Sequence, residues 1–267
     1  MRWQIGLSLA ALAITAPANM PCFADSPSAE EPRYEVYVGA GYDSPTANLS
    51  SSTVWSPFNP VNQSGFRLKF DGLAGLYGGT DASPFSGNYM LACEKDVADL
   101  MAGYQFAYGS ATIKLYAGGA YGMRTGQGIL ALDTVYVDVM RQEKTWGGAA
   151  AFQSYWPMSD RIWASLNVTW LQPDDSTSIY SRAAYEIYRT DGGLKIYAGA
   201  ESNFSLTGEP SPKDGKMFDH YEKYLQGGAL LNLRYGVNDF SLSGGLSQAS
   251  NETVSRPYAS ISYGRQF

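Results

Sequence analysis

Charged residues are scarce in this chain. They make up 16% of its 267 residues, against about 25% in an average globular domain. Cysteine occurs twice and histidine once, which excludes a disulfide-rich scaffold and leaves few ligands for a His/Cys metal site. Acidic residues outnumber basic ones by 25 to 19, so the basic surface of a typical nucleic-acid-binding protein is excluded as well.

Long hydrophobic runs are also absent after residue 24. No stretch there approaches the roughly 18 apolar residues of a transmembrane helix, and the mean hydropathy is −0.23. The chain is rich instead in aromatic residues (14%), among them 20 tyrosines, and in glycine, with 29 residues. This composition excludes disorder and favours an all-β protein, whose alternating membrane strands a hydropathy plot would miss.

The first 24 residues read as a separate unit. A positive charge at the start is followed by an uncharged run from 5 to 16 and by small residues at Cys22 and Ala24. This order predicts a secretory signal peptide cleaved after Ala24, and therefore export in a Gram-negative bacterium. Residues 25–33 are polar and predict a flexible lead-in. Cleavage would leave Cys93 as the only cysteine, which we expect in a loop.

From residue 34 onward, apolar and polar residues alternate. Residues 66–71, for example, read Phe-Arg-Leu-Lys-Phe-Asp. Alternation with period two predicts strands, and no segment keeps a helical period over a comparable length. The predicted strands are 34–42, 50–58, 65–77, 96–106, 111–123, 144–156, 161–171, 176–189, 194–206, 223–236, 240–250 and 257–267.

The predicted connections alternate between short and long. The even-numbered ones are short turns, the first of them at 59–64, whereas three odd-numbered ones are long, at 78–95, 124–143 and 207–222. Outer-membrane barrels have short periplasmic turns and longer outer loops. The sequence therefore predicts that residues 34–267 form a single antiparallel transmembrane β-barrel of about 12 strands, with 10 or 14 as alternatives, in outer-membrane lipid.

Aromatic residues mark the ends of the predicted strands. Phe267, the last residue, ends an alternating strand, and we expect it to act as an assembly signal for the barrel-assembly machinery. Other strand-end aromatic residues, Trp163 among them, are predicted to form girdles at the two membrane interfaces.

The polar face of the strands is predicted to line the lumen. Its basic and acidic residues are nearly balanced, which fits a ladder of ion pairs that fills the barrel. It also fits a polar conduit, in which tyrosines beside charges suit sugar. Twelve strands lie between the filled barrels of eight and the open barrels of sixteen, so both arrangements stay open. The candidate lumen-facing residues are Arg67, Lys69, Asp71, Asp99, Lys114, Tyr116, Arg182, Glu186, Lys195, Tyr197, Glu201 and Arg234.

The sequence shows no recognisable catalytic centre. Its only histidine, His220, is predicted to lie in a loop with no marked nucleophile nearby. No catalytic, cofactor-binding or metal-binding residue is predicted, and no cofactor is expected. We therefore expect a non-enzymatic protein, with an outer-membrane lipid hydrolase as the distant alternative.

Short segments spread along the chain carry a family resemblance. They include DGLAGLY at 71–77, ADLMAGYQ at 98–105, WGGA at 146–149 and YSRAAY at 180–185. These segments resemble the cellulose-biosynthesis BcsS family of Gram-negative outer-membrane proteins. The resemblance implies a role in cellulose biosynthesis, cellulose export or biofilm formation, with the cellulose synthase complex or its glucan as partner. The alternative is a narrow outer-membrane porin for oligosaccharides or small solutes.

Overall fold

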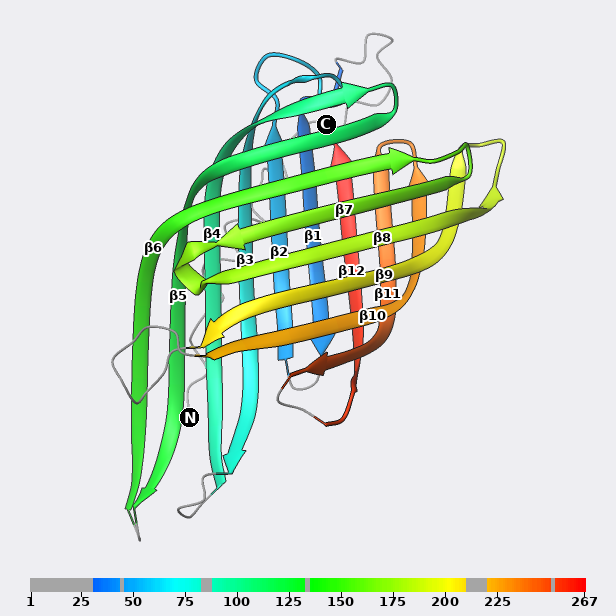
Figure 1. Ribbon diagram of the computed structural model, residues 1–267. Helices are drawn as coiled ribbons and strands as arrows, with labels where there is room; N and C mark the ends of the chain where they lie inside the picture. The colour runs from blue at the N-terminus through cyan, green and yellow to red at the C-terminus, as the bar shows by residue number, and fades with distance from the viewer. Residues whose placement is uncertain (1–30, 44–45, 83–87, 133–134, 210–219, 251–252) are drawn as a thin grey trace.

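The computed structural model describes residues 31–43, 46–82, 88–132, 135–209, 220–250 and 253–267. Twelve antiparallel strands form one sheet that closes on itself, because the first strand pairs with the last as well as with the second (Figure 1). The predicted twelve-strand barrel is confirmed. The predicted signal peptide and most of the lead-in lie outside the described residues.

The strands differ greatly in length. They are β1 (Tyr34–Asp43), β2 (Thr46–Trp55), β3 (Gly65–Ala82), β4 (Asn88–Tyr108), β5 (Ala111–Leu132), β6 (Val135–Pro157), β7 (Ile162–Leu171), β8 (Ser176–Arg189), β9 (Leu194–Glu209), β10 (His220–Tyr235), β11 (Asn238–Ala249) and β12 (Arg256–Gln266). A short 3-10 turn, η1 (Gln172–Asp174), follows β7. Among the described residues, no helix is long and apolar enough to cross a membrane.

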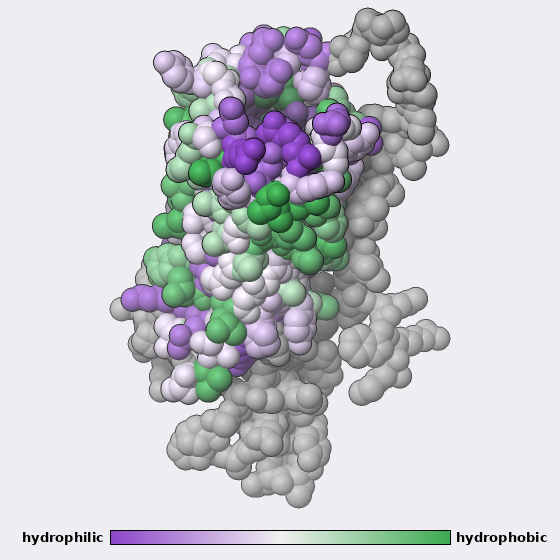
Figure 2. Space-filling model, turned by 90° about the vertical axis from the view of Figure 1, so that its right-hand side faces the viewer, coloured by the Kyte–Doolittle hydropathy of each residue, from purple (hydrophilic) through white to green (hydrophobic). Residues whose placement is uncertain are grey.

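Period-two alternation turns apolar side chains outward and polar ones inward. In β4, Leu100 is 62% exposed, whereas its neighbour Asp99 is 5% exposed. An exposed Leu beside a buried Asp is the reverse of a water-soluble domain and is the pattern of a barrel whose outer face meets lipid. Figure 2 shows hydrophobic residues in a band around the side of the barrel, below a strongly hydrophilic patch near its upper end.

Two predicted loops are wrong, because strand pairing continues through them. Residues 78–95 belong mostly to β3 and β4, and residues 124–143 belong mostly to β5 and β6. The β5–β6 pair extends as far as Leu132 opposite Val135. Backbone pairing continues through both extensions. A strand that has passed beyond the lipid needs no apolar face, so the alternation fades there.

Smaller differences concern individual residues. β2 begins and ends a few residues earlier than the predicted 50–58, because Thr46 already pairs with Asp43. Cys93 lies in β4, where its backbone pairs with β3 and β5, rather than in a loop. His220 is the first residue of β10.

The two ends of the barrel are unlike. One end carries the connections at 56–64, 109–110, 158–161, 190–193 and 236–237 together with the C-terminus, and we call it the turn end. It lies uppermost in Figure 1, while β3 to β6 extend furthest at the opposite end. Four of its five connections are tight turns, as the predicted alternation of short and long connections requires. The fifth, at 56–64, has a structure of its own.

Candidate functional site

Side chains bridge the interior of the barrel. Lys114 Nζ of β5 lies 2.5 Å from Glu35 Oε2 of β1. Tyr258 of β12 donates a hydrogen bond of 3.0 Å from its hydroxyl to Glu201 Oε1 of β9. Neither pair comes from strands that neighbour each other in the sheet, so these contacts cross the lumen. The interior is therefore braced by polar contacts rather than left as a smooth-walled channel.

The twelve candidate lumen residues all lie on the less accessible side of their strands. Seven are buried, namely Arg67, Lys69, Asp99, Tyr116, Glu186, Tyr197 and Glu201. Five are partly buried, namely Asp71, Lys114, Arg182, Lys195 and Arg234. The structure does not gather them at one point: they form two groups, one on the side of β1 to β5 and one on the side of β6 to β12.

The first group contains a buried charge cluster. Lys69 forms an ion pair with Asp71 on its own strand, and Asp71 lies opposite Asp99 of β4 in the sheet register. The ammonium group of Lys69 also lies 5.7 Å from the centre of the Tyr116 ring, within range of a cation–π contact. One lysine therefore pairs with one carboxylate and lies beside a phenol ring, with the second carboxylate, Asp99, across the strand pair from the first.

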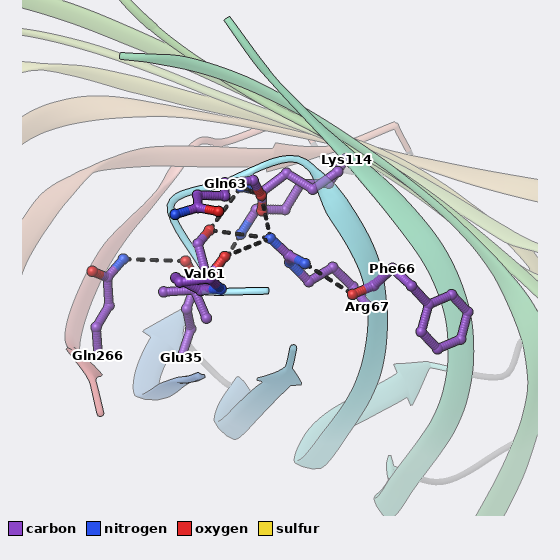
Figure 3. Close-up of polar contacts among 9 residues, drawn as sticks. Glu35, Val61, Gln63, Phe66, Arg67, Lys114 and Gln266 are labelled. Atoms are coloured by element: carbon purple, nitrogen blue, oxygen red, sulfur yellow. Dashed lines mark hydrogen bonds and ion pairs between the residues drawn. The ribbon is translucent and has the colours of Figure 1, made fainter. Parts of the chain in front are cut away.

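The connection Ser56–Ser64, which we call the mouth loop, folds against this group at the turn end (Figure 3). Arg67 donates from Nη2 to the carbonyl oxygens of Pro60, at 3.1 Å, and Gln63. Gln105 donates from Nε2 to the carbonyl oxygens of Val61, at 2.7 Å, and Gln63, at 3.1 Å. Arg67 and Gln105 are fully buried, and Val61 is 2% exposed.

The chain preceding β1 holds the mouth loop from a second direction. The backbone N–H of Val61 donates to the carbonyl of Pro32 at 2.8 Å, and that of Ser56 donates to Arg33 at 2.9 Å. The predicted short turn at 59–64 is therefore a folded segment that occupies part of the mouth. The sequence of the loop itself does not predict this folded segment. The only signal is the lumen-facing Arg67 beside the loop, because a buried arginine needs hydrogen-bond acceptors nearby.

The second group surrounds Arg234. Its guanidinium carbon lies 4.6 Å from the ring centre of Trp163, 5.1 Å from that of Tyr197 and 5.5 Å from that of Tyr155. Nε also donates to Asp239 Oδ2 at 2.9 Å. Rings on several sides and a carboxylate fix this cation in one position.

The prediction that Trp163 belongs to an interface girdle is wrong. Trp163 is 3% exposed and lies inside the barrel, whereas Trp170 and Tyr235 are exposed. The period-two pattern of β7 contains the signal, because Trp163 shares its face with Ser165 and Asn167. A strand-end position alone does not tell an interface aromatic from a lumen aromatic.

Arg182 and Glu201 lie beside this second group. The guanidinium of Arg182 lies 5.2 Å from the ring centre of Tyr180, and the Tyr180 hydroxyl donates to Glu201. Glu201 thus accepts from two tyrosine hydroxyls, those of Tyr180 and Tyr258. Glu186 instead pairs with Arg189, at 2.7 Å, near the turn end.

A cavity of about 660 Å³ opens at the turn end beside Arg234. Its lining includes Tyr155, Trp163, Lys195, Tyr197, Arg234 and the turns at 158–161 and 192–193. Such a volume is typical of small-molecule sites, which span about 300–1,000 Å³. The two sides of the mouth therefore differ: the mouth loop occupies one, and this cavity lies in the other.

The described residues offer little for metal or acid–base chemistry. Within residues 31–43, 46–82, 88–132, 135–209, 220–250 and 253–267, no group of three or more His, Cys, Asp or Glu could hold a metal ion. The side chain of His220 lies outside the described residues. What the interior can do is bind charged or hydroxyl-bearing groups through fixed cations, carboxylates and phenols.

Phe267 closes the seam between β1 and β12. Its carbonyl accepts from the backbone N–H of Arg33, at 2.5 Å, and of Tyr34, at 3.0 Å. Its own N–H donates to Tyr34 at 2.8 Å. The Phe267 ring is exposed, and the guanidinium of Arg265 lies 4.7 Å from its centre.

We expect Phe267→Ala to lower the yield of folded barrel in cells while leaving refolding in detergent unchanged. The substitution keeps the three backbone hydrogen bonds and removes only the exposed ring, so a loss confined to cells identifies recognition by the assembly machinery. Deleting Phe267 removes those bonds too, at about 0.5–1.5 kcal/mol each, and should lower both yields. The heat-modifiable band on gels measures folding. An unchanged cellular yield of Phe267→Ala would contradict the assembly role.

Comparisons with known proteins give similarity of overall shape alone. No family model matches the sequence, and no curated protein matches it. The β domain of the Bordetella autotransporter BrkA is 14% identical, with a TM-score of 0.44, over 89% of this chain and 99% of that one. The transport unit of the autotransporter AIDA-I from Escherichia coli is 11% identical, with a TM-score of 0.48, over 99% of both chains. The translocator domain of autotransporter NalP from Neisseria meningitidis is 11% identical, with a TM-score of 0.43, over 90% of both. The strand pairing of this chain itself shows an outer-membrane-type β-barrel of twelve strands.

Proposed function

We propose that this barrel is a non-enzymatic outer-membrane component of bacterial cellulose biosynthesis, cellulose export or biofilm formation. The resemblance of its segments to the cellulose-biosynthesis BcsS family supports this role. Its turn end would face the periplasm, since outer-membrane barrels keep their short turns there. Its partners would be outer-membrane lipid, the barrel-assembly machinery, and the cellulose synthase complex or its glucan.

One observation carries the choice of a closed barrel over an open pore. The mouth loop is held in the turn end by two fully buried side chains, Arg67 and Gln105. The lumen behind it is crossed by contacts such as Lys114 to Glu35. A glucan strand would have to displace both. We therefore assign the protein a supporting role beside the export route rather than that of the conduit.

The second candidate is a narrow porin for oligosaccharides or small solutes. The cavity of about 660 Å³ in the other part of the mouth favours it, because a solute could enter there without moving the mouth loop. Conductance separates the two candidates. A lipid hydrolase stays the distant alternative, and release of fatty acid from phospholipid vesicles by the purified barrel would establish it.

Deleting the gene should reduce cellulase-digestible glucan on the cell surface and weaken biofilm, and the wild-type gene should restore both. The Gly119→Val variant should restore them equally well and serves as a matched control for expression, because a Cβ atom at Gly119 would meet no atom nearer than 3.8 Å. Membrane fractionation should recover the protein with the outer membrane in each restored strain. Unchanged glucan and biofilm after deletion would contradict the cellulose role, and recovery in the soluble periplasm would contradict the barrel's placement.

A further inference from the structure

We propose that the cavity at the turn end binds a small molecule through an oxyanion, a carboxylate or phosphate group. This inference does not depend on the cellulose role. The cavity is lined by the turn-end residues of β6, β7, β9 and β10 and by residues of the turns at 158–161, 190–193 and 236–237. Its volume of about 660 Å³ suits a ligand of the size of a sugar acid or a sugar phosphate.

The lining of the cavity is positively charged although the chain as a whole is acidic. Arg161, Lys195 and Arg234 line it, against one carboxylate, Asp160. The whole chain carries a formal charge of −6. A concave site walled by protein concentrates the field of its charges and attracts ions of the opposite sign. An anion that enters this cavity therefore meets three cations and one carboxylate among the residues that line it.

Three cations stand in a row across the sheet beside the cavity. Lys195 of β9 lies in register with Arg189 of β8 and Arg234 of β10. Like charges directly opposite each other destabilise a sheet. The outer two members have carboxylate partners, since Arg189 pairs with Glu186 and Arg234 pairs with Asp239. Lys195 takes part in none of the ion pairs found among the described residues. Its charge acts on the Glu186 carboxylate only at longer range, and a bound oxyanion would give it a direct partner.

Trp163 borders the same space but offers it no donor. Its indole nitrogen has no acceptor among the described residues, and it is also buried from solvent, so a ligand in the cavity does not reach it. Trp163 contributes instead the ring against which the guanidinium of Arg234 packs, at 4.6 Å from the ring centre.

The aromatic rings do not offer the usual stacking surface for a neutral sugar. The guanidinium of Arg234 already lies within 4.6–5.5 Å of the ring centres of Trp163, Tyr197 and Tyr155. The rings instead hold the cation in place, so that ordering Arg234 costs little when a ligand binds. For this reason the site should distinguish glucuronate and glucose 6-phosphate from neutral glucose.

Isothermal titration of the detergent-purified barrel tests the site with four probes: glucuronate, glucose 6-phosphate, inorganic phosphate and glucose. We expect at least one of the two sugar anions to bind, more weakly as salt is raised, and glucose not to bind measurably. If only one of the two sugar anions binds, the site distinguishes a carboxylate from a phosphate group. If inorganic phosphate binds as tightly as glucose 6-phosphate, the site recognises the anion and not the sugar.

Three variants separate this site from a general charge effect. Lys195→Gln should weaken binding about tenfold or more, because it removes a charge-assisted hydrogen bond. Lys195→Arg should retain binding. Lys223→Gln, an exposed lysine of β10, removes the same charge elsewhere and should leave the affinity unchanged. Heat-modifiable mobility confirms that each variant is folded. Glucose binding as tightly as the anions, no binding of any anion, or equal losses for Lys195→Gln and Lys223→Gln would overturn the proposal.

Discussion

Replacing Arg67 and Gln105 together by alanine should turn a weakly conducting barrel into one that conducts several-fold better in planar bilayers. These two side chains hold the carbonyl oxygens of Pro60, Val61 and Gln63. Each lost hydrogen bond weakens the attachment of the mouth loop by about 0.5–1.5 kcal/mol. Without them the loop keeps only its backbone hydrogen bonds to the chain before β1, such as that from Val61 to Pro32. We expect it to leave the mouth more often, so that its part of the lumen opens.

The matched control removes one arginine and one glutamine from another part of the lumen. Arg182→Ala with Gln226→Ala deletes the same two side-chain types. Gln226 of β10 is partly buried and alternates with the exposed Leu225, and neither Arg182 nor Gln226 has a described contact with the mouth loop. Its conductance should stay close to that of the wild type. Equal increases in both double variants would show that lost volume, rather than loop release, opens the barrel. High conductance of the wild type itself would favour the porin.

Gly118→Val should abolish the folded barrel almost completely. A Cβ atom at Gly118 would lie 2.1 Å from the carbonyl oxygen of Leu100 and 2.6 Å from the Cα of Met101. Both are backbone atoms of β4, so relief requires the two strands to move apart. We expect a loss above about 4 kcal/mol, beyond the range of most single substitutions. The folded fraction on unboiled gels measures it.

The adjacent glycine provides the control. At Gly119 the nearest atom to a Cβ is the carbonyl oxygen of Gly147, at 3.8 Å, which is ordinary contact. Valine favours strands at both positions, so the two variants differ in available space. Gly119→Val should fold like the wild type. Equal folded fractions for the two variants would contradict the close approach of β4 and β5 at Gly118.

Period two makes much of this fold predictable from sequence. A basic side chain on the lipid face at mid-bilayer destabilises a barrel by about 2–4 kcal/mol, so Arg67 and Lys69 must face the lumen. The apolar residues that alternate with them, at 66, 68 and 70, then face lipid. The same rule yields the number of strands and which residues line the lumen. It depends on a lipid-facing surface, and it fails for the ends of β3 to β6, where no lipid imposes an apolar face.

The candidate site was only partly predictable, because its contacts join strands that are distant in sequence. The inward direction of Lys195 and Arg234 follows from alternation. Their alignment in one row follows from strand register, which is set by turns such as the one around Gly193, where φ is +86°. The mouth loop was not predictable, since its conformation depends on carbonyl acceptors that no residue type reveals.

The seam between β1 and β12 has a consequence for the order of folding. It joins Tyr34 to Phe267, whereas the other strand pairs join neighbours in sequence. Closing so long a loop from an unstructured chain costs about 3 kcal/mol more in chain entropy than closing a short hairpin. Sequential pairing of hairpins avoids most of that cost but leaves a curved sheet with β1 and β12 as two unpaired edges. The folding intermediate most prone to aggregation is therefore this open sheet. It can pair edge to edge with another copy until its own first and last strands meet.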